Sequence, residues 1–263
     1  MSDEITTYRI KELSLERINP NTSNYMNPDQ GGSKIFVIGK PGTGKSTLIK
    51  SLIYYKKHII PCIRVASGTE DSNGTYRKFV PSTFVFNKYD EEEFKEGIKR
   101  QKLAKKHLPN PWRIELEDDC TEDPKIFKSS TQQSMMKNGR HYKELYIVSL
   151  QYAMDIRPNI RVNIDGTFIL RETQLNIRRV LYENFAGIIP DFSLFCQLMD
   201  ELTTDFTAMY IDNASKSNNW QDCVFYYRAD TTKIPSDFKF GCPDIWDFHF
   251  QRYNPEYVDP IVV

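Results

Sequence analysis

The sequence predicts an α/β domain in which a mostly parallel central sheet carries helices on both faces. Apolar or β-branched runs typical of strands alternate along the chain with segments of helical spacing. The first of these runs ends directly in a glycine-rich loop, and the loop is followed by a helical pattern. With 263 residues, 40% of them hydrophobic and 27% charged, the chain has an ordinary globular composition and enough apolar material for a sizeable core.

The first 33 residues are expected to lead the chain into this domain. Residues 17–33 are rich in proline, asparagine and glycine, which is typical of a loop. The core begins with the apolar run 35–38, which we expect to be a strand. Residues 47–55 then place Leu48, Ile49, Leu52 and Ile53 at the spacing of one helix face.

The remaining elements follow in alternation up to residue 230. We expect the domain to span 34–230 and residues 231–263, rich in proline, aspartate and aromatic side chains, to form a tail packed on its surface. The expected strands are 59–66, 83–87, 145–150, 166–170, 207–211 and 223–227, and the expected helices are 91–106, 127–137, 174–185 and 191–202.

Composition excludes several classes of protein. No run approaches the ~20 apolar residues of a membrane span, and no apolar block near the start resembles a signal peptide, so we expect a soluble, intracellular protein. Five widely spaced cysteines without a CxxC pair support neither a disulfide framework nor a zinc site. Thirty-five basic and 35 acidic residues give zero formal charge, which argues against coating nucleic acid but leaves local contacts through short basic segments open.

A phosphate-binding loop is the strongest motif. Residues 39–46, GKPGTGKS, fit the pattern GxxxxGK[ST] completely. Its glycines let backbone N–H groups approach the phosphates of ATP, while Lys45 neutralises charge and Ser46 reaches Mg²⁺. The expected nucleotide-binding residues are Gly39, Lys40, Pro41, Gly42, Thr43, Gly44, Lys45, Ser46 and Thr47.

Such a site needs an acid for Mg²⁺ and usually a second acid to polarise the attacking water. Asp118 and Asp119 end a segment that alternates polar and apolar residues, and neighbouring side chains there point in opposite directions and can serve metal and water separately. Asp212 ends a cleaner apolar run, which periodicity favours as a buried central strand. Gln151 follows the strand 145–150 and is placed to face the ligand crevice.

Taken in order, the motifs resemble the genome-packaging ATPases of nucleocytoplasmic large DNA viruses, within the FtsK–HerA superfamily of P-loop motors. The resemblance covers roughly residues 33–230, and NGRHY followed by QY is its most specific part. The matching words are IFVIGKPGTGKST (35–47), SGTE (67–70), EDDC (117–120), NGRHY (138–142), IVSLQY (147–152) and MYIDNAS (209–215).

The resemblance implies a RecA-like ATPase that assembles into a ring and drives double-stranded DNA into a capsid. It also implies a capsid, portal or membrane partner in the virion, and a place in the virus factory or the assembling virion. It gives Asp118 to the metal and removes Asp212 from that role. The other roles it implies are water activation by Asp119, γ-phosphate sensing by Gln151, and an arginine finger at Arg140, with Arg157 and Arg161 as alternatives.

The segment 90–106 has an uneven charge distribution. Residues 90–96 carry five acids against one lysine, whereas residues 97–106 carry five bases and no acid. The basic half is either a DNA-contacting edge or a solvated helix whose charges suit the helix dipole. On the first interpretation, charge reversal at Lys102 and Lys105 lowers DNA-stimulated ATP hydrolysis.

Three other functions compete with this interpretation. A GTPase switch would use DxxG at 71–74 and NKxD at 87–90, but the 12 residues between Gly74 and Asn87 are too few for the helix and strand that must separate them. A nucleotide or metabolite kinase would need an arginine-rich lid that closes over two substrates. The basic run 97–106 is instead rich in lysine and lies on an expected helix. A structural capsid or scaffold protein with a vestigial loop conflicts with the intact Lys45, Ser46 and Asp118.

Overall fold

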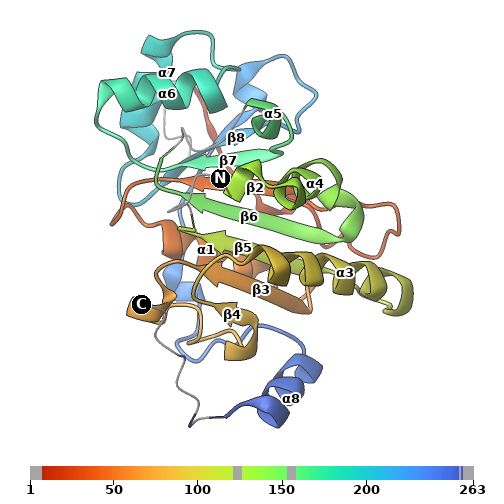
Figure 1. Cartoon of the computed structure of the whole chain (residues 1–263). Helices are drawn as coiled ribbons and strands as arrows, with labels where there is room; N and C mark the ends of the chain where they lie inside the picture. The colour runs from red at the N-terminus through yellow and green to blue at the C-terminus, as the bar shows by residue number, and fades with distance from the viewer. Residues whose placement is uncertain (1–7, 121–125, 153–157, 255, 257–263) are drawn as a thin grey trace.

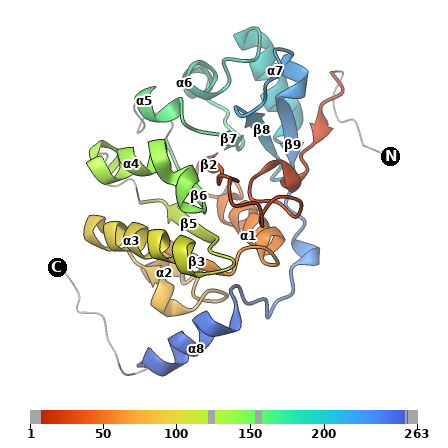
Figure 2. The same ribbon diagram turned by 90° about the vertical axis from the view of Figure 1, so that its right-hand side faces the viewer.

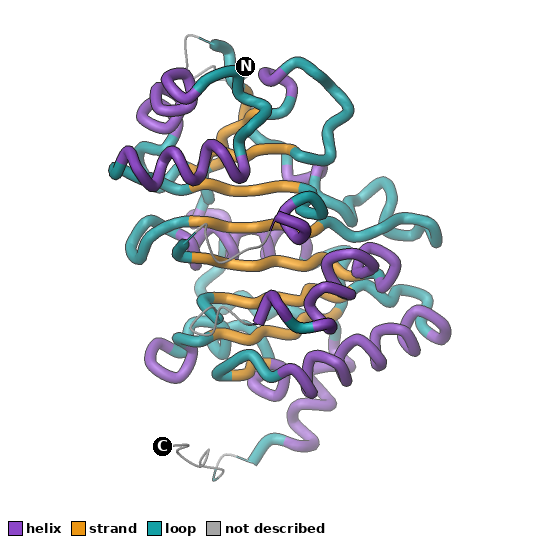
Figure 3. Tube along the Cα trace, turned by 45° about the horizontal axis from the view of Figure 1, so that its top comes forward, coloured by secondary structure: helices purple, strands orange, loops and turns teal. Residues whose placement is uncertain are grey.

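A computed structural model describes residues 8–120, 126–152, 158–254 and 256. In this part of the chain one nine-stranded sheet has the order β1-β9-β8-β7-β2-β6-β5-β3-β4 (Figures 1 and 3). Strand β8 runs antiparallel to β7 and β9, and all other neighbours are parallel, which confirms the mostly parallel sheet. The strands are β1 (Lys11–Glu12), β2 (Lys34–Ile38), β3 (Cys62–Ser67), β4 (Val85–Phe86), β5 (Arg113–Asp118), β6 (Glu144–Leu150), β7 (Gly166–Ile169), β8 (Ala208–Asp212) and β9 (Val224–Tyr227).

Helices cover both faces of this sheet, as the alternating pattern predicts. Helix α1 lies on one face, and α3, α4, α6 and α7 lie on the other (Figure 2). Within the described residues, no helix combines the length and the apolar character needed to cross a bilayer. The helices are α1 (Lys45–Lys56), α2 (Glu70–Asn73), α3 (Glu91–His107), α4 (Ser130–Asn138), α5 (Pro158–Arg161), α6 (Leu175–Phe185), α7 (Phe192–Leu202) and α8 (Pro243–Arg252).

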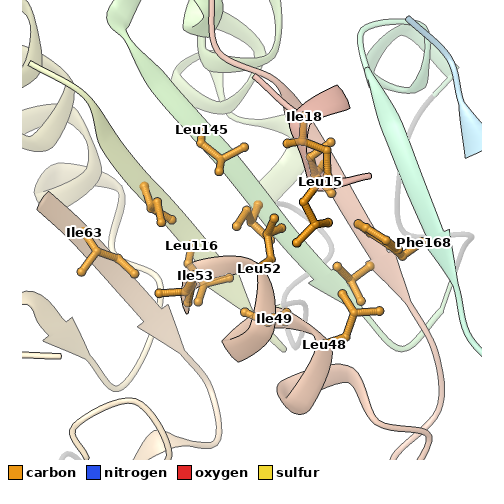
Figure 4. Close-up of a cluster of buried hydrophobic side chains, with 14 of the residues drawn as sticks. Leu15, Ile18, Leu48, Ile49, Leu52, Ile53, Ile63, Leu116, Leu145 and Phe168 are labelled. Carbon is orange, nitrogen blue, oxygen red and sulfur yellow. The ribbon is translucent and has the colours of Figure 1, made fainter. Parts of the chain in front are cut away.

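The core on the α1 face fixes both the phosphate-loop helix and the lead-in segment. Leu48, Ile49, Leu52 and Ile53 of α1 are buried against the sheet (Figure 4). At the end of the same helix, Lys56 Nζ donates to three backbone carbonyl oxygens at 2.7–2.9 Å, and burial lowers its pKa to about 8. These carbonyls belong to the lead-in residues Leu15, Ile18 and Pro20.

Two elements go beyond the sequence prediction. The lead-in contributes β1, which pairs with β9 and extends the sheet. The tail contributes Phe238 and Phe240 to the core and then forms α8, which lies beyond β4 (Figure 1). The hydroxyl of Thr83 and Nδ1 of His249 lie 2.6 Å apart and fasten α8 to the sheet edge. The aromatic residues spread along α8 obscure the helical spacing of apolar residues from which a helix is predicted.

Strand β5 shows how an alternating polar strand is buried on both faces. Ile114 and Leu116 point into the α1-side core, whereas Arg113, Glu115 and Glu117 are buried on the opposite face, where Arg113 and Glu115 form ion pairs. Arg64 of β3 donates to Glu115 at 2.5 Å. The cluster, in which two arginines face three carboxylates, comprises Arg64, Arg113, Glu115, Glu117 and Glu144.

Protonation of Glu117 reduces the negative charge of this cluster. Burial, and next the charge of Glu115, raises the Glu117 pKa from 4.5 to about 8, while Gln132 Nε2 donates to its Oε1 at 2.5 Å. At neutral pH the Glu117 carboxyl group is therefore mostly protonated, which reduces the negative charge buried beside Arg64 and Arg113.

Stability should therefore depend on pH through Glu117. Between pH 4.5 and 8 the folded chain keeps a proton at this group that the unfolded chain loses, so the free energy of unfolding falls as pH rises, by up to about 1.4 kcal/mol per pH unit. In Glu117→Gln this slope should shrink, leaving the part due to Glu144, whose pKa is raised to about 7. Urea unfolding at several pH values measures the slope. Equal slopes in both proteins would contradict the assignment.

Candidate nucleotide site

The phosphate loop occupies the carboxyl end of β2, in the centre of the sheet. Gly39 N donates to the carbonyl of Leu150 at 3.1 Å, which ties the start of the loop to the end of β6. Gly44 precedes α1 with a φ of 102°, a left-handed conformation that favours glycine. The amino-terminal end of α1 thus faces the loop, and the predicted strand, loop and helix are confirmed.

Asp118 ends β5 beside β6 and is buried. Tyr76 donates its hydroxyl to Asp118 Oδ2 at 2.8 Å. Asp118 Oδ1 and the hydroxyl of Ser149 are both buried, and within the described part of the chain neither makes a hydrogen bond of ordinary geometry. The two residues are register partners on β5 and β6. Burial raises the pKa of Asp118, the nearby hydroxyl of Ser149 opposes this shift, and the negative charge of Asp119 adds to it.

Asp119 joins the acids to the phosphate loop. Its Oδ1 lies 2.6 Å from Lys45 Nζ, and the lysine is only 6% exposed. A φ of 48° places Asp119 in the left-handed region, so the chain turns sharply after β5. Gly68 makes this turn possible, because a Cβ at that position would lie 2.4 Å from the carbonyl oxygen of Asp119.

The donor atoms at this edge suit Mg²⁺. This ion prefers oxygen ligands and is usually bound by one or two carboxylates together with phosphate oxygens and water. The buried Oδ1 of Asp118 is such an oxygen, and Ser46 stands at the start of α1 in the phosphate loop. Ser46 and Asp118 therefore offer oxygen atoms of the kind that a magnesium ion prefers.

The interpretation of Asp212 as the metal acid from periodicity is wrong. Strand β8 is antiparallel to β7 and pairs Asp212 with Gly166, the first residue of β7. The end of β8 therefore lies at the edge opposite the phosphate loop. There, Asp212 accepts from Arg17 Nη1 at 3.4 Å and from the backbone of Ala214 at 3.1 Å. An apolar run shows burial but not strand direction.

Gln151 lies at the correct edge. It follows β6 and lines a small pocket together with Gly39, Lys40 and Glu172. Glu172 follows β7 and is buried, and its Oε1 accepts from Lys40 Nζ and from the backbone of Gln174, both at 2.7 Å. This contact holds the second residue of the phosphate loop.

Sequence reasoning missed three residues of this site. Glu172 and Ser149 had a usable signal, since each is a polar residue within or just after an apolar strand. Tyr76 had none, because only the folded chain brings its hydroxyl to Asp118 from 42 positions away.

Arg140 lies at the opposite edge of the sheet. It belongs to the turn Gly139–Tyr142, which precedes β6, and its Nη2 lies 3.1 Å from Asp165 Oδ1. The five residues of β2, roughly 16 Å of strand, separate this edge from the phosphate loop of the same chain. Arg140 is 52% exposed and lines a surface hollow of about 830 Å³.

Arg157 and Arg161 are the alternative candidates for the arginine finger. Arg161 ends α5, and burial lowers its pKa. Arg157 lies outside the described residues.

Helix α3 carries its acidic residues in the first turn and its basic residues in the last turn. Asp90 caps it by accepting from Glu93 N at 2.9 Å, which gives one member of the NKxD motif a local structural role. Lys105 Nζ donates to the carbonyl of His141 at 3.0 Å, and Lys102 Nζ lies 5.0 Å from the centre of the Tyr142 ring. Charge reversal at these two lysines would therefore disturb the turn that holds Arg140.

Comparison with known proteins finds close viral relatives. The chain is 54% identical to protein 088R of invertebrate iridescent virus 3 over 92% of this chain and 93% of the relative. Identity to protein 075L of invertebrate iridescent virus 6 is 51%, over 95% of this chain and 96% of the relative. Protein L437 of Acanthamoeba polyphaga mimivirus is 32% identical over 85% and 80% of the two chains. No known family model matches the sequence.

Among solved structures, the chain resembles the genome-packaging NTPase B204 of Sulfolobus turreted icosahedral virus 2 in complex with AMPPCP. The TM-score is 0.54 at 16% identity, and the match covers 78% of this chain and 100% of B204. The conjugation coupling protein TcpA of pCW3 gives a TM-score of 0.52 at 13% identity, over 76% of this chain and 62% of TcpA. At such identities the likeness is one of fold, and it confirms the RecA-like α/β class.

Proposed function

We propose that this chain, a member of the viral protein family that includes 088R and 075L of the invertebrate iridescent viruses, is an ATP-hydrolysing motor that moves double-stranded viral DNA into the capsid. The observation that supports this proposal most strongly is the contact between Lys45 of the phosphate loop and Asp119, which follows the buried Asp118. The fold shared with the packaging NTPase B204 supports the same activity.

The geometry supports a separate role for each of these residues. Backbone N–H groups of residues 39–46 and the start of α1 would bind the phosphates. Lys45 would exchange its contact with Asp119 for the phosphates, which frees the Asp119 carboxylate to accept a proton from the attacking water. Ser46 and Asp118 would hold Mg²⁺, which neutralises phosphate charge when bound. Gln151, at the end of β6, would sense the γ-phosphate.

The place of Arg140 supports ring assembly as part of this proposal. An arginine at the edge opposite its own phosphate loop can serve only a neighbouring subunit's nucleotide, and arginine fingers supplied in this way stabilise charge in the transition state. We include in the proposal a homo-oligomeric ring, a capsid, portal or membrane partner, and a place in the virus factory or the assembling virion.

The rate of ATP hydrolysis, with and without long double-stranded DNA across a range of protein concentrations, tests this function. We expect phosphate release without any acceptor molecule, stimulation by DNA, and a rate per subunit that rises with concentration as rings form. A strict requirement for an acceptor would favour a kinase, and exclusive use of GTP would favour a GTPase.

The solvent-exposed basic residues of α3 provide a test of DNA contact. Arg100→Glu combined with Lys106→Glu should lower DNA stimulation several-fold and leave the basal rate unchanged, because phosphate contacts depend on local positive charge. The matched control is Lys11→Glu with Lys216→Glu, a pair of exposed lysines on the β8–β9 side of the sheet. Equal stimulation of both double variants would assign the basic half of α3 to solvation alone.

A further inference from the structure

An exposed aromatic side chain lies directly beside the phosphate loop. Phe206, between α7 and β8, is 68% exposed. Its Cβ and Cδ1 atoms lie 3.3 Å from the position that a Cβ on Gly44 would take. Any larger residue at position 44 would therefore press on this ring.

The backbone that holds Phe206 beside the phosphate loop is strained. Asp205 and Phe206 have φ angles of 48° and 60°, so two successive residues adopt the left-handed conformation. For a bulky side chain this conformation is unfavourable, and such residues gather at ligand sites. The position of Phe206 is therefore not explained by burial of its ring, which is mostly exposed, and its backbone is strained.

The order of strands places Phe206 on the side of the loop opposite the acids. Asp118 and Asp119 follow β5, two strands from β2 in one direction, whereas Phe206 precedes β8, two strands from β2 in the other. Both lie at the phosphate-loop edge, because β8 is antiparallel and begins where β7 ends. A nucleoside triphosphate with its γ-phosphate toward the acids therefore extends its nucleoside end toward Phe206.

We propose that Phe206 is the stacking platform for the nucleotide base. The proposal rests on the nucleotide-binding part of the function above and is independent of DNA translocation. A flat apolar ring attracts the face of any base without reading its polar edge, so it provides affinity but little discrimination between ATP and GTP.

Binding of a nucleotide and of inorganic tripolyphosphate separates base contacts from phosphate contacts. In calorimetric titrations, Phe206→Ala should raise the Kd of the non-hydrolysable analogue AMPPNP about 10-fold and leave the Kd of tripolyphosphate unchanged. Phe206→Tyr should keep the wild-type affinity for both ligands. The matched control is Phe250→Ala, which removes a ring of 69% exposure on α8 and should change neither Kd.

A tryptophan variant provides a direct signal. The fluorescence of Phe206→Trp, relative to wild type, should be quenched by AMPPNP and not by tripolyphosphate. An unchanged AMPPNP affinity in Phe206→Ala, or equal losses for both ligands, would overturn the platform, the second outcome assigning Phe206 to support of the phosphate loop. A wild-type chain that binds neither ligand would contradict the proposed function as well.

Discussion

Asp119→Asn is expected to lower the kcat of ATP hydrolysis by at least about 100-fold, the usual effect of removing a general base. ATP should still bind, because the phosphate loop is unchanged and Lys45 loses its 2.6 Å contact with a charged carboxylate. The Kd for ATP should therefore equal or fall below that of the wild type. Single-turnover hydrolysis and equilibrium binding measure the two quantities separately.

Asp212→Asn is the control for this result. Asp212 is a carboxylate at a strand end, like Asp118, but lies at the opposite edge of the sheet beside Arg17. We expect a kcat close to that of the wild type. Loss of hydrolysis in Asp212→Asn with retained hydrolysis in Asp118→Asn would show that the metal site is assigned to the wrong acid.

Arg140→Ala should lower the kcat of the assembled protein by roughly 1,000-fold, as loss of an arginine finger does. Binding of ATP to each subunit should persist, because Arg140 lies at the edge away from its own phosphate loop. The Asp165 carboxylate, which pairs with Arg140 at 3.1 Å, would be left in a partly exposed position, so the fold should tolerate the change.

Mixed rings show whether the arginine acts across subunits. Lys45→Ala lacks a working phosphate loop but keeps Arg140, whereas Arg140→Ala has the reverse combination. Mixing the two inactive variants should restore measurable hydrolysis, since a Lys45→Ala subunit can supply its arginine to a neighbour. Absence of any recovery in rings shown to contain both variants would place the role of Arg140 within its own subunit.

Much of this architecture is predictable from the sequence. The run 35–38, the glycine loop and the helical spacing after it define β2, the phosphate loop and α1, because local patterns alone determine them. Asp118 and Asp119 are also identifiable, because adjacent carboxylates at the end of a strand can serve metal and water separately. In the folded chain Asp118 ends β5, and Asp119 lies beside Lys45.

Other features depend on contacts between distant segments. The direction of β8 depends on its pairing with β7 and β9, so an apolar pattern alone placed Asp212 at the wrong edge. The polar residues of β5 are buried because Arg64 and Glu144 on neighbouring strands pair with them. Phe206 carries no motif, and only the folded chain brings it to Gly44.

Triplex displacement tests the central claim most directly. A third-strand oligonucleotide bound to long double-stranded DNA is released when a motor moves along the duplex, and its release is followed by fluorescence. We predict release by the wild type that requires ATP hydrolysis and that is absent in Asp119→Asn and Arg140→Ala. ATP hydrolysis stimulated by DNA, without any release of the third strand, would contradict a motor that translocates double-stranded DNA.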